Sequence, residues 1–167
     1  LVSVYNNQSF DDVLFIYLQN DDPDYPLIEK EGNIVRIANE ETGKTIGYNF
    51  FNASELIDGL EEDGPFTLTE SQVNTLNEAL DKAGFNSELV ADESLKFVVG
   101  HVKECVPHEE SDHLSITQTE VDNGEVLQIV CGAANIAQGQ KVVVAKPGAV
   151  MPDGLIIWPG ELRGVAS

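Results

Sequence analysis

The chain has 167 residues, of which 29 are acidic and 9 are basic, so its formal net charge at pH 7 is -20. This length is enough for one sizeable core or two small ones, and no apolar run approaches the roughly 20 residues of a membrane span. So large a negative charge excludes a protein that coats nucleic acid by bulk electrostatic attraction. No signal-peptide pattern opens the chain, and we therefore expect a soluble, cytoplasmic protein with no membrane partner.

The negative charge is concentrated in the first half of the chain. Residues 1–94 carry 20 acidic and 4 basic side chains, whereas residues 95–167 carry 9 and 5, so the net charges are -16 and -4. The polar break ADES, residues 91–94, lies at the point where the composition changes. We therefore predict an acidic domain over residues 1–92 and a second domain over residues 95–167.

The first half has the pattern of an antiparallel sheet. Residues 13–18 (VLFIYL) are a continuous apolar run, which is typical of a central strand covered on both faces. Two turn signals, EGN and ETGK, divide the following segment into strands at residues 27–30, 33–40 and 45–51. This succession predicts an antiparallel meander.

Two helices are predicted after these strands. Residues 52–60 place Leu56 and Leu60 at helical spacing. Thr69 and Gln72 have the spacing of a capping box, and a second apolar stripe follows them as far as Gly84. The first half is therefore predicted to be an α+β domain, an antiparallel sheet with two helices.

The second half has the pattern of an all-β domain. Its five short strand candidates are separated by Pro, Gly, Asn or Asp and lie at residues 97–106, 114–122, 125–131, 140–146 and 155–158. Five short strands in about seventy residues suit a small closed barrel, of which the OB-fold is the commonest five-stranded example. A small sandwich and an SH3-like barrel are the alternatives.

A glycine-rich stretch, CGAANIAQGQKVVVAKPGA, begins at Cys131 and could be taken for a phosphate-binding loop. Such a loop needs Gly-Lys followed by a hydroxyl residue and then a helix. Here Gln140 separates Gly139 from Lys141, Val142 stands where the hydroxyl belongs, and β-branched residues follow. The pattern therefore indicates a loop that leads into a strand.

Four side chains, His101, Cys105, His108 and His113, have a spacing that resembles a zinc site. In a strand, however, four residues span about 13 Å, which is too far for His101 and Cys105 to share one ion. We therefore expect surface histidines, one buried thiol and no metal. No catalytic triad order, nucleophile elbow or cofactor fingerprint is present, so we expect neither an enzyme nor a cofactor.

Several matched motifs in the second half give a specific resemblance. They are VVGHV (98–102), PHEESDHL (107–114), QIVCGAANI (128–136), GQKVVVAKPGAVMPDG (139–154) and LRGVAS (162–167). Residues 97–167 resemble the tRNA-binding OB-fold domain of the phenylalanyl-tRNA synthetase beta chain and of the EMAP II group. With its acidic first half, the chain is similar to the two-domain YtpR-like tRNA-binding proteins. The resemblance implies recognition of the outer shape of folded tRNA, and it implies a C-terminal end that is incomplete at Ser167.

The resemblance also implies which residues meet tRNA. Lys141, Lys146 and Arg163 are expected to contact phosphates, with Asn135 and Ser167 as hydrogen-bonding residues of the rim. A solvated charge is the alternative for each lysine, and contact with backbone carbonyls is the alternative for Arg163.

His113 also belongs to the expected tRNA-contacting set. It stands where the family usually has a lysine, and Glu109 and Glu110 replace neutral residues nearby. The alternative function is a protein-interaction module that kept the barrel, with the acidic domain docking a protein partner.

Overall fold

The computed structural model describes residues 1–167 and divides them into two compact units, Leu1–Ser94 and Leu95–Ser167. We call these the N-terminal unit and the C-terminal unit. Every strand pairing in both units is antiparallel. No helix of the structure is long and apolar enough to cross a membrane.

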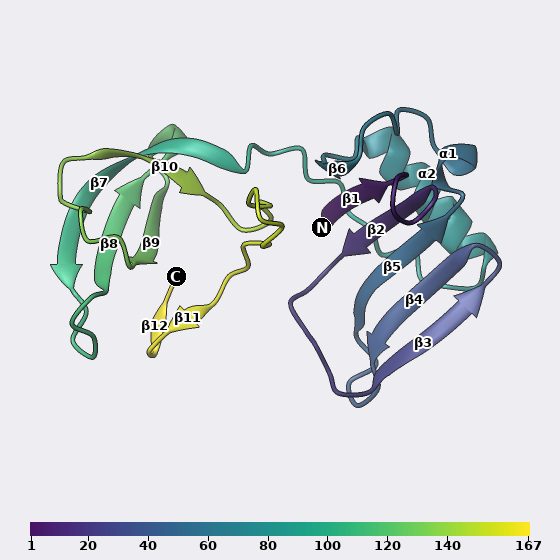
Figure 1. Cartoon of the computed structure of the whole chain (residues 1–167), viewed down its shortest axis with the longest axis horizontal. Helices are drawn as coiled ribbons and strands as arrows, with labels where there is room; N and C mark the ends of the chain where they lie inside the picture. The colour runs from purple at the N-terminus through teal and green to yellow at the C-terminus, as the bar shows by residue number, and fades with distance from the viewer. The chain divides into compact units, whose positions relative to one another are not determined.

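The N-terminal unit is a six-stranded sheet with two helices, and its strand order is β3-β4-β5-β2-β1-β6 (Figure 1). The strands are β1 (Val2–Asn6), β2 (Val13–Tyr17), β3 (Pro26–Glu31), β4 (Ile34–Asn39), β5 (Thr45–Phe51) and β6 (Gly64–Phe66). The helices are α1 (Ala53–Leu56) and α2 (Glu70–Lys82). The predicted meander is therefore confirmed as β3-β4-β5, while β1 and β6 are additional strands.

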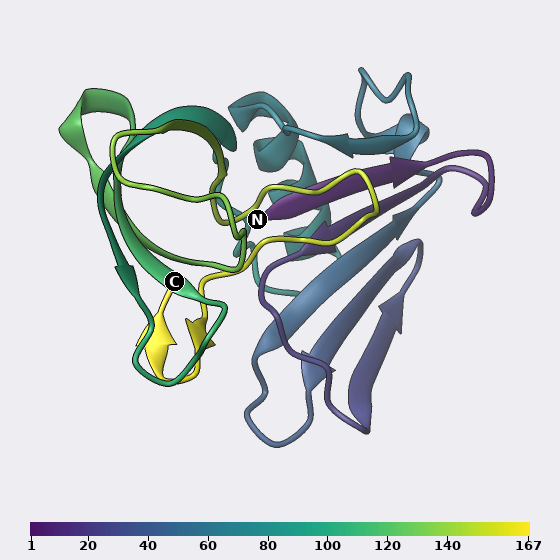
Figure 2. The same cartoon turned by 60° about the vertical axis from the view of Figure 1, so that its left-hand side comes forward.

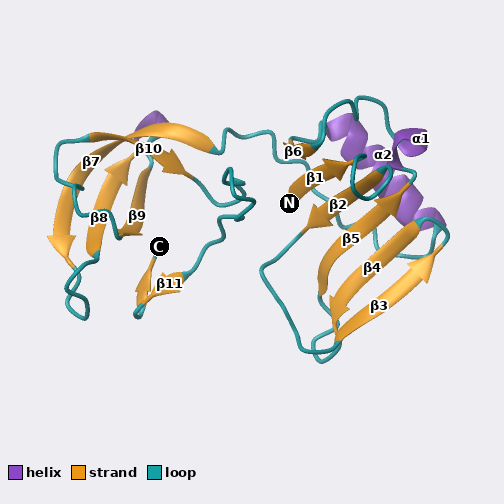
Figure 3. Cartoon of the chain, in the orientation of Figure 1, coloured by secondary structure: helices purple, strands orange, loops and turns teal.

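One face of this sheet carries the core. Leu14, Ile16, Tyr48 and Phe50 are buried and pack with residues of α2, including Leu76. Strand β2 lies inside the sheet, as predicted, but the prediction that both of its faces are covered holds only in part. Its second face carries a buried Val13, a half-buried Phe15 and a Tyr17 that is 36% exposed, because both helices serve the opposite face (Figure 3).

The two helices differ in how well the sequence predicted them. The capping box of α2 is present, since the Thr69 hydroxyl accepts a hydrogen bond from the Gln72 amide and the Gln72 side chain accepts one from the Thr69 amide. The first helix is only four residues long, not nine. Its C-cap, Ile57, is extended (φ -132°, ψ 143°), and Gly59 adopts a positive φ, so the chain leaves the helical conformation before Leu60.

Gly47 permits a close approach between β2 and β5. A Cβ atom on this residue would lie 2.2 Å from the carbonyl oxygen of Ile16. Because that neighbour is backbone and cannot rotate away, only glycine fits here without a shift of the strands. The close packing of β2 against β5 therefore requires glycine at position 47.

The C-terminal unit contains only strands and one short 3-10 helix, Asp122–Gly124. Its main sheet has the order β10-β7-β8-β9, and a two-stranded hairpin follows it. The strands are β7 (Phe97–Pro107), β8 (Ser115–Glu120), β9 (Val126–Cys131), β10 (Lys141–Ala145), β11 (Glu161–Leu162) and β12 (Val165–Ala166).

Strand β7 is bent and serves both halves of this sheet. Its first half pairs with β10 and its second half with β8, with a register shift between Val102 and Glu104. Gly100 lies on the inner side of the bend, where a Cβ would be 2.6 Å from Thr119 Cγ2 and 2.8 Å from Val144 Cγ2. The bulge and the glycine together allow the sheet to curl, as Figure 2 shows.

The prediction of a fifth barrel strand at residues 155–158 was wrong. Ile156 forms only an isolated bridge with Val150, and the Ile157 amide donates to the Ala149 carbonyl at 2.8 Å. The turn at Gly154 (φ 91°) folds this segment onto the residues just before it, so its hydrogen bonds stay within one loop. The sheet is consequently curled but not closed, and a small hairpin, β11-β12, takes the place of the predicted strand.

Candidate nucleic-acid interface

A groove of about 660 Å³ lies in the C-terminal unit between the two edge strands of the curled sheet. Residues of both β9 and β10 line it, which shows that the curl brings these edges to face one another. Most of the lining is apolar, with Thr117, Thr119, Gln140 and Lys146 among its polar residues. The apolar side chains are Leu127, Ile129, Ile136, Val142, Val143, Val144, Ile157 and Trp158.

The floor of the groove is held by two buried threonines of β8. The hydroxyls of Thr117 and Thr119 lie 3.1 Å apart, and the Thr117 hydroxyl also donates to the Ile129 carbonyl at 3.0 Å. Both side chains are at most 2% exposed. Their polar atoms are therefore satisfied within the protein, and the floor offers a ligand shape rather than hydrogen bonds.

The glycine-rich loop between β9 and β10 is held together by its own hydrogen bonds. The Gln140 side chain accepts from the Ala137 amide at 3.0 Å and donates to the Asn135 carbonyl at 2.9 Å. The Gly139 amide donates to the Val102 carbonyl at 2.7 Å. These hydrogen bonds fix the conformation of the loop, and they occupy the amides of Ala137 and Gly139.

Three of the six predicted contact residues line the groove: Asn135, Lys146 and Ser167. Lys146 is not a free cation, because its ammonium lies 3.3 Å from a carboxylate oxygen of Glu125. The Ser167 hydroxyl accepts a hydrogen bond from the Val130 amide at 3.0 Å, which ties the end of the described chain to β9. Of the three, only the Asn135 side chain makes no hydrogen bond.

The other three predicted residues lie outside the groove. Lys141 is exposed at the start of β10, directly opposite His101 of β7, and forms no ion pair. His113 is exposed and lies 3.0 Å from an Asp112 carboxylate oxygen, and this contact lowers the pKa of Asp112 below its usual value. Arg163 donates to the Glu110 carbonyl at 2.7 Å, which is the backbone contact foreseen as its alternative role.

His108 has a structural role that the sequence did not reveal. It is 3% exposed, so the expectation of a surface histidine was wrong at this position. Its Nδ1 accepts from the Glu110 amide at 3.0 Å, so its Nε2 carries the proton and donates to the Leu162 carbonyl at 3.2 Å. Together with Arg163, it joins the loop that follows β7 to the hairpin β11-β12.

The residues of the suspected zinc pattern make separate contacts and do not form a common site. Cys105 is half-buried with its thiol directed at the Ile136 carbonyl, 3.9 Å away. His108 uses both ring nitrogens for the contacts just described. The structure contains no group of three or more His, Cys, Asp or Glu side chains arranged to hold a metal ion.

Two family models match the chain, one in each unit. "Domain of unknown function (DUF4479)" covers residues 24–92, and "Putative tRNA binding domain" covers residues 97–167. The chain is also 48% identical over 163 residues to the "Putative tRNA-binding protein YtpR" of Bacillus subtilis. That match covers 98% of this chain and 80% of the relative.

The chain is also similar to a small part of a much longer protein. The chain is 52% identical over 80 residues to the phenylalanine–tRNA ligase beta subunit of Oceanobacillus iheyensis, and 57% identical over 72 residues to that of Campylobacter jejuni. These matches cover 48% and 43% of this chain but only 10% and 9% of the two subunits. The similarity therefore concerns one domain of those ligases.

Proposed function

The chain belongs to the same protein family as YtpR of Bacillus subtilis, and on that basis we propose that it is a noncatalytic tRNA-binding protein that needs no cofactor. The observation that carries the proposal is the 48% identity to a protein named for tRNA binding, which extends over 98% of the chain. The match of residues 97–167 to a tRNA-binding domain assigns the binding to the C-terminal unit. A cytoplasmic location, where tRNA is found, fits this function.

The curled sheet of the C-terminal unit supports an OB-type mode of binding. A folded tRNA hides its base edges in deep major grooves and presents phosphates, 2′-hydroxyls and its outer contour. A groove with a satisfied floor and polar residues at its rim suits such a surface, since it recognises shape and backbone rather than sequence. We assign the rim to Asn135, Lys146 and Ser167.

The cations of this unit contribute unequally to the proposed contact. Lys141 is exposed and forms no ion pair, so it can contact phosphate without giving up a bond within the protein. Arg163 keeps its charge while bonded to a neutral carbonyl, and His113 adds a further donor nearby. Lys146 must share its ammonium with Glu125 or leave it. With a net charge of -4 on the unit, binding is weak to moderate.

A second candidate function rests on the charge of the N-terminal unit. Its 20 acidic and 4 basic residues repel tRNA, whereas they attract a basic protein surface. An acidic unit linked to a tRNA-binding unit would then bring a protein partner and tRNA together. If the chain binds no tRNA, this interaction role becomes the main one.

A titration of the full chain with bulk tRNA at about 50 and 200 mM salt tests the proposal. Three phosphate contacts, from Lys141, Lys146 and Arg163, predict a slope of log affinity against log salt of roughly -2 to -3. Lys141→Gln should reduce that slope by about one contact, whereas the matched control Lys82→Gln, on α2 of the other unit, should not. Absence of binding at the lower salt concentration would refute the proposed function.

A further inference from the structure

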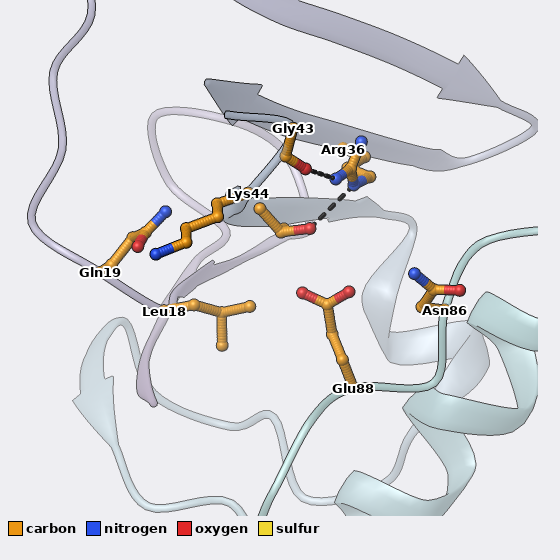
Figure 4. Close-up of a pocket in the computed structure, with 8 residues that line it drawn as sticks. Leu18, Gln19, Arg36, Gly43, Lys44, Asn86 and Glu88 are labelled. Atoms are coloured by element: carbon orange, nitrogen blue, oxygen red, sulfur yellow. Dashed lines mark hydrogen bonds between the residues drawn. The ribbon is translucent and has the colours of Figure 1, made fainter. Parts of the chain in front are cut away.

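The N-terminal unit contains a cavity of about 360 Å³ that the proposed tRNA binding does not use. Its volume lies within the range of about 300–1,000 Å³ that is usual for small-molecule sites. Figure 4 shows the residues that line it, which come from the end of β2, from β4, from the turn before β5 and from the segment after α2. The lining residues are Leu18, Gln19, Arg36, Gly43, Lys44, Thr45, Asn86 and Glu88.

Arg36 forms a fixed wall of this cavity. Its Nε donates to the Thr45 hydroxyl at 2.8 Å, its Nη2 donates to the Gly43 carbonyl at 2.7 Å, and its Nη1 contacts the Glu29 carboxylate at 2.5 Å. Its side chain is only 15% exposed. The guanidinium is therefore held rigidly, and its charge is already balanced by Glu29.

Two charged side chains on opposite sides of the cavity have no partner. Lys44 and Glu88 form no ion pair with each other or with any other residue, and Figure 4 shows the Glu88 carboxylate pointing into the pocket while the Lys44 side chain extends toward Gln19. The side chains of Gln19 and Asn86 belong to the same lining. The charges of Arg36 and Glu29 cancel, so the remaining charges of the lining are one positive, on Lys44, and one negative, on Glu88.

A buried hydroxyl without a partner lies beneath the same cavity. Tyr48 is fully buried, and its hydroxyl makes no hydrogen bond. Burial raises the pKa of Tyr48, while Thr45, Glu88 and Arg36 lie near enough to act on it. All three of these neighbours line the cavity, which places the hydroxyl under its floor. Because Tyr48 does not line the pocket, its hydroxyl acts on a ligand only through Thr45 and Glu88, the two lining residues that lie closest to it.

We propose that this cavity binds a small zwitterion of the amino-acid class, with its carboxylate at Lys44 and its ammonium at Glu88. A ligand that is only anionic would face Glu88 and the -16 charge of the unit, and a ligand that is only cationic would face Lys44 and Arg36. A neutral, dipolar ligand avoids both penalties and pairs with both free charges. Leu18 supplies the contact for its aliphatic part.

The direct test is a series of NMR titrations of the isotopically labelled full chain with each of the common L-amino acids at up to about 10 mM. We expect amide shifts at residues 43–45 and 86–88 for at least one amino acid. Its N-acetyl derivative, which lacks the ammonium, and its carboxamide, which lacks the carboxylate, should each bind at least about tenfold more weakly. No shift at these residues with any amino acid, or equal binding of a derivative, would overturn the proposal.

Variants separate binding from folding. Lys44→Gln and Glu88→Gln should each weaken binding by about tenfold or more while leaving the amide spectrum dispersed. The matched control Lys30→Gln, on the exposed strand β3 and away from the cavity, should bind like the parent chain. Full binding by Lys44→Gln or Glu88→Gln would contradict the assigned contacts.

Discussion

Replacing Glu125 with glutamine should strengthen tRNA binding, because Glu125 neutralises one of the proposed phosphate contacts. The Lys146 ammonium lies 3.3 Å from the Glu125 carboxylate. A phosphate bound to the far side of the ammonium, about 2.8 Å away, would lie about 6 Å from that carboxylate. Two unit charges at about 6 Å repel by about 0.7 kcal/mol in water, and screening at a Debye length of about 8 Å reduces this by roughly half.

This estimate gives a measurable effect. Removing about 0.3–0.7 kcal/mol of repulsion predicts that Glu125→Gln binds tRNA roughly two to three times more tightly. Lys146→Gln should weaken binding and reduce the salt slope by about 0.7 to 0.9. In the double variant the gain from Glu125→Gln should be smaller, since without Lys146 no phosphate is held about 6 Å from residue 125. Fluorescence anisotropy with labelled tRNA would measure all three dissociation constants.

The control is Glu104→Gln, which makes the same change in net charge far from Lys146. Glu104 is seven residues along β7 from Phe97, the partner of Ala145, which corresponds to at most about 23 Å because the strand is bent. Its charge is therefore screened more strongly than that of Glu125, which lies 3.3 Å from the Lys146 ammonium. Equal tightening by Glu104→Gln, or no change with Glu125→Gln, would show that Lys146 does not contact phosphate.

Three further substitutions test the fold of the protein. Asp12 accepts hydrogen bonds from Ser54 and Tyr5; burial acts to raise its pKa, but these bonds outweigh burial and lower it. The stabilisation by the Asp12 carboxylate is therefore present above the unfolded pKa of about 3.9 and is lost as the pH falls through the lower folded value. Asp12→Asn should lower the free energy of unfolding by about 1–2 kcal/mol in urea at pH 7, and it should make that free energy depend less on pH in acid. Gly47→Ala should cost about 1–3 kcal/mol or more by calorimetry, whereas Gly160→Ala, with open space around it, should be close to neutral. Thr69→Ala should cost about 1 kcal/mol through loss of the α2 cap, again by urea unfolding, and an unchanged midpoint would contradict the role of the capping box.

The elements that the sequence predicted well are those specified by neighbouring residues. The capping box at Thr69 and Gln72 and the turn between β3 and β4 depend on contacts within a few residues. Strand β6 was missed because it has only three residues and pairs across about sixty residues, as Phe66 does with Ser3. The hairpin β11-β12 was missed because Arg163, at φ 49°, takes a left-handed position that arginine rarely occupies.

The sequence predicted several residues of the candidate interface, but it did not predict the residues that they contact within the protein. Lys146 and Arg163 were identified, yet their partners Glu125 and Glu110 are 21 and 53 residues away in the chain. Only the fold brings such residues together, so the sequence could not separate the exposed Lys141 from the paired Lys146. The buried role of His108 depends in the same way on the distant Leu162 carbonyl.

The shared strand β7 also sets an order of assembly for the C-terminal unit. Its pairings with β8, and of β8 with β9, join neighbouring segments, whereas β10 must return over about forty residues to pair with the first half of β7. Loop closure of that length slows the step, so β10 is expected to join last and to open first. We therefore expect the amide hydrogens of β10, which begins at Lys141, to exchange more readily than those of β8, which is paired on both sides. A bound RNA that bridges β10 to the rest of the sheet would suppress this opening, so recognition and local folding are thermodynamically linked.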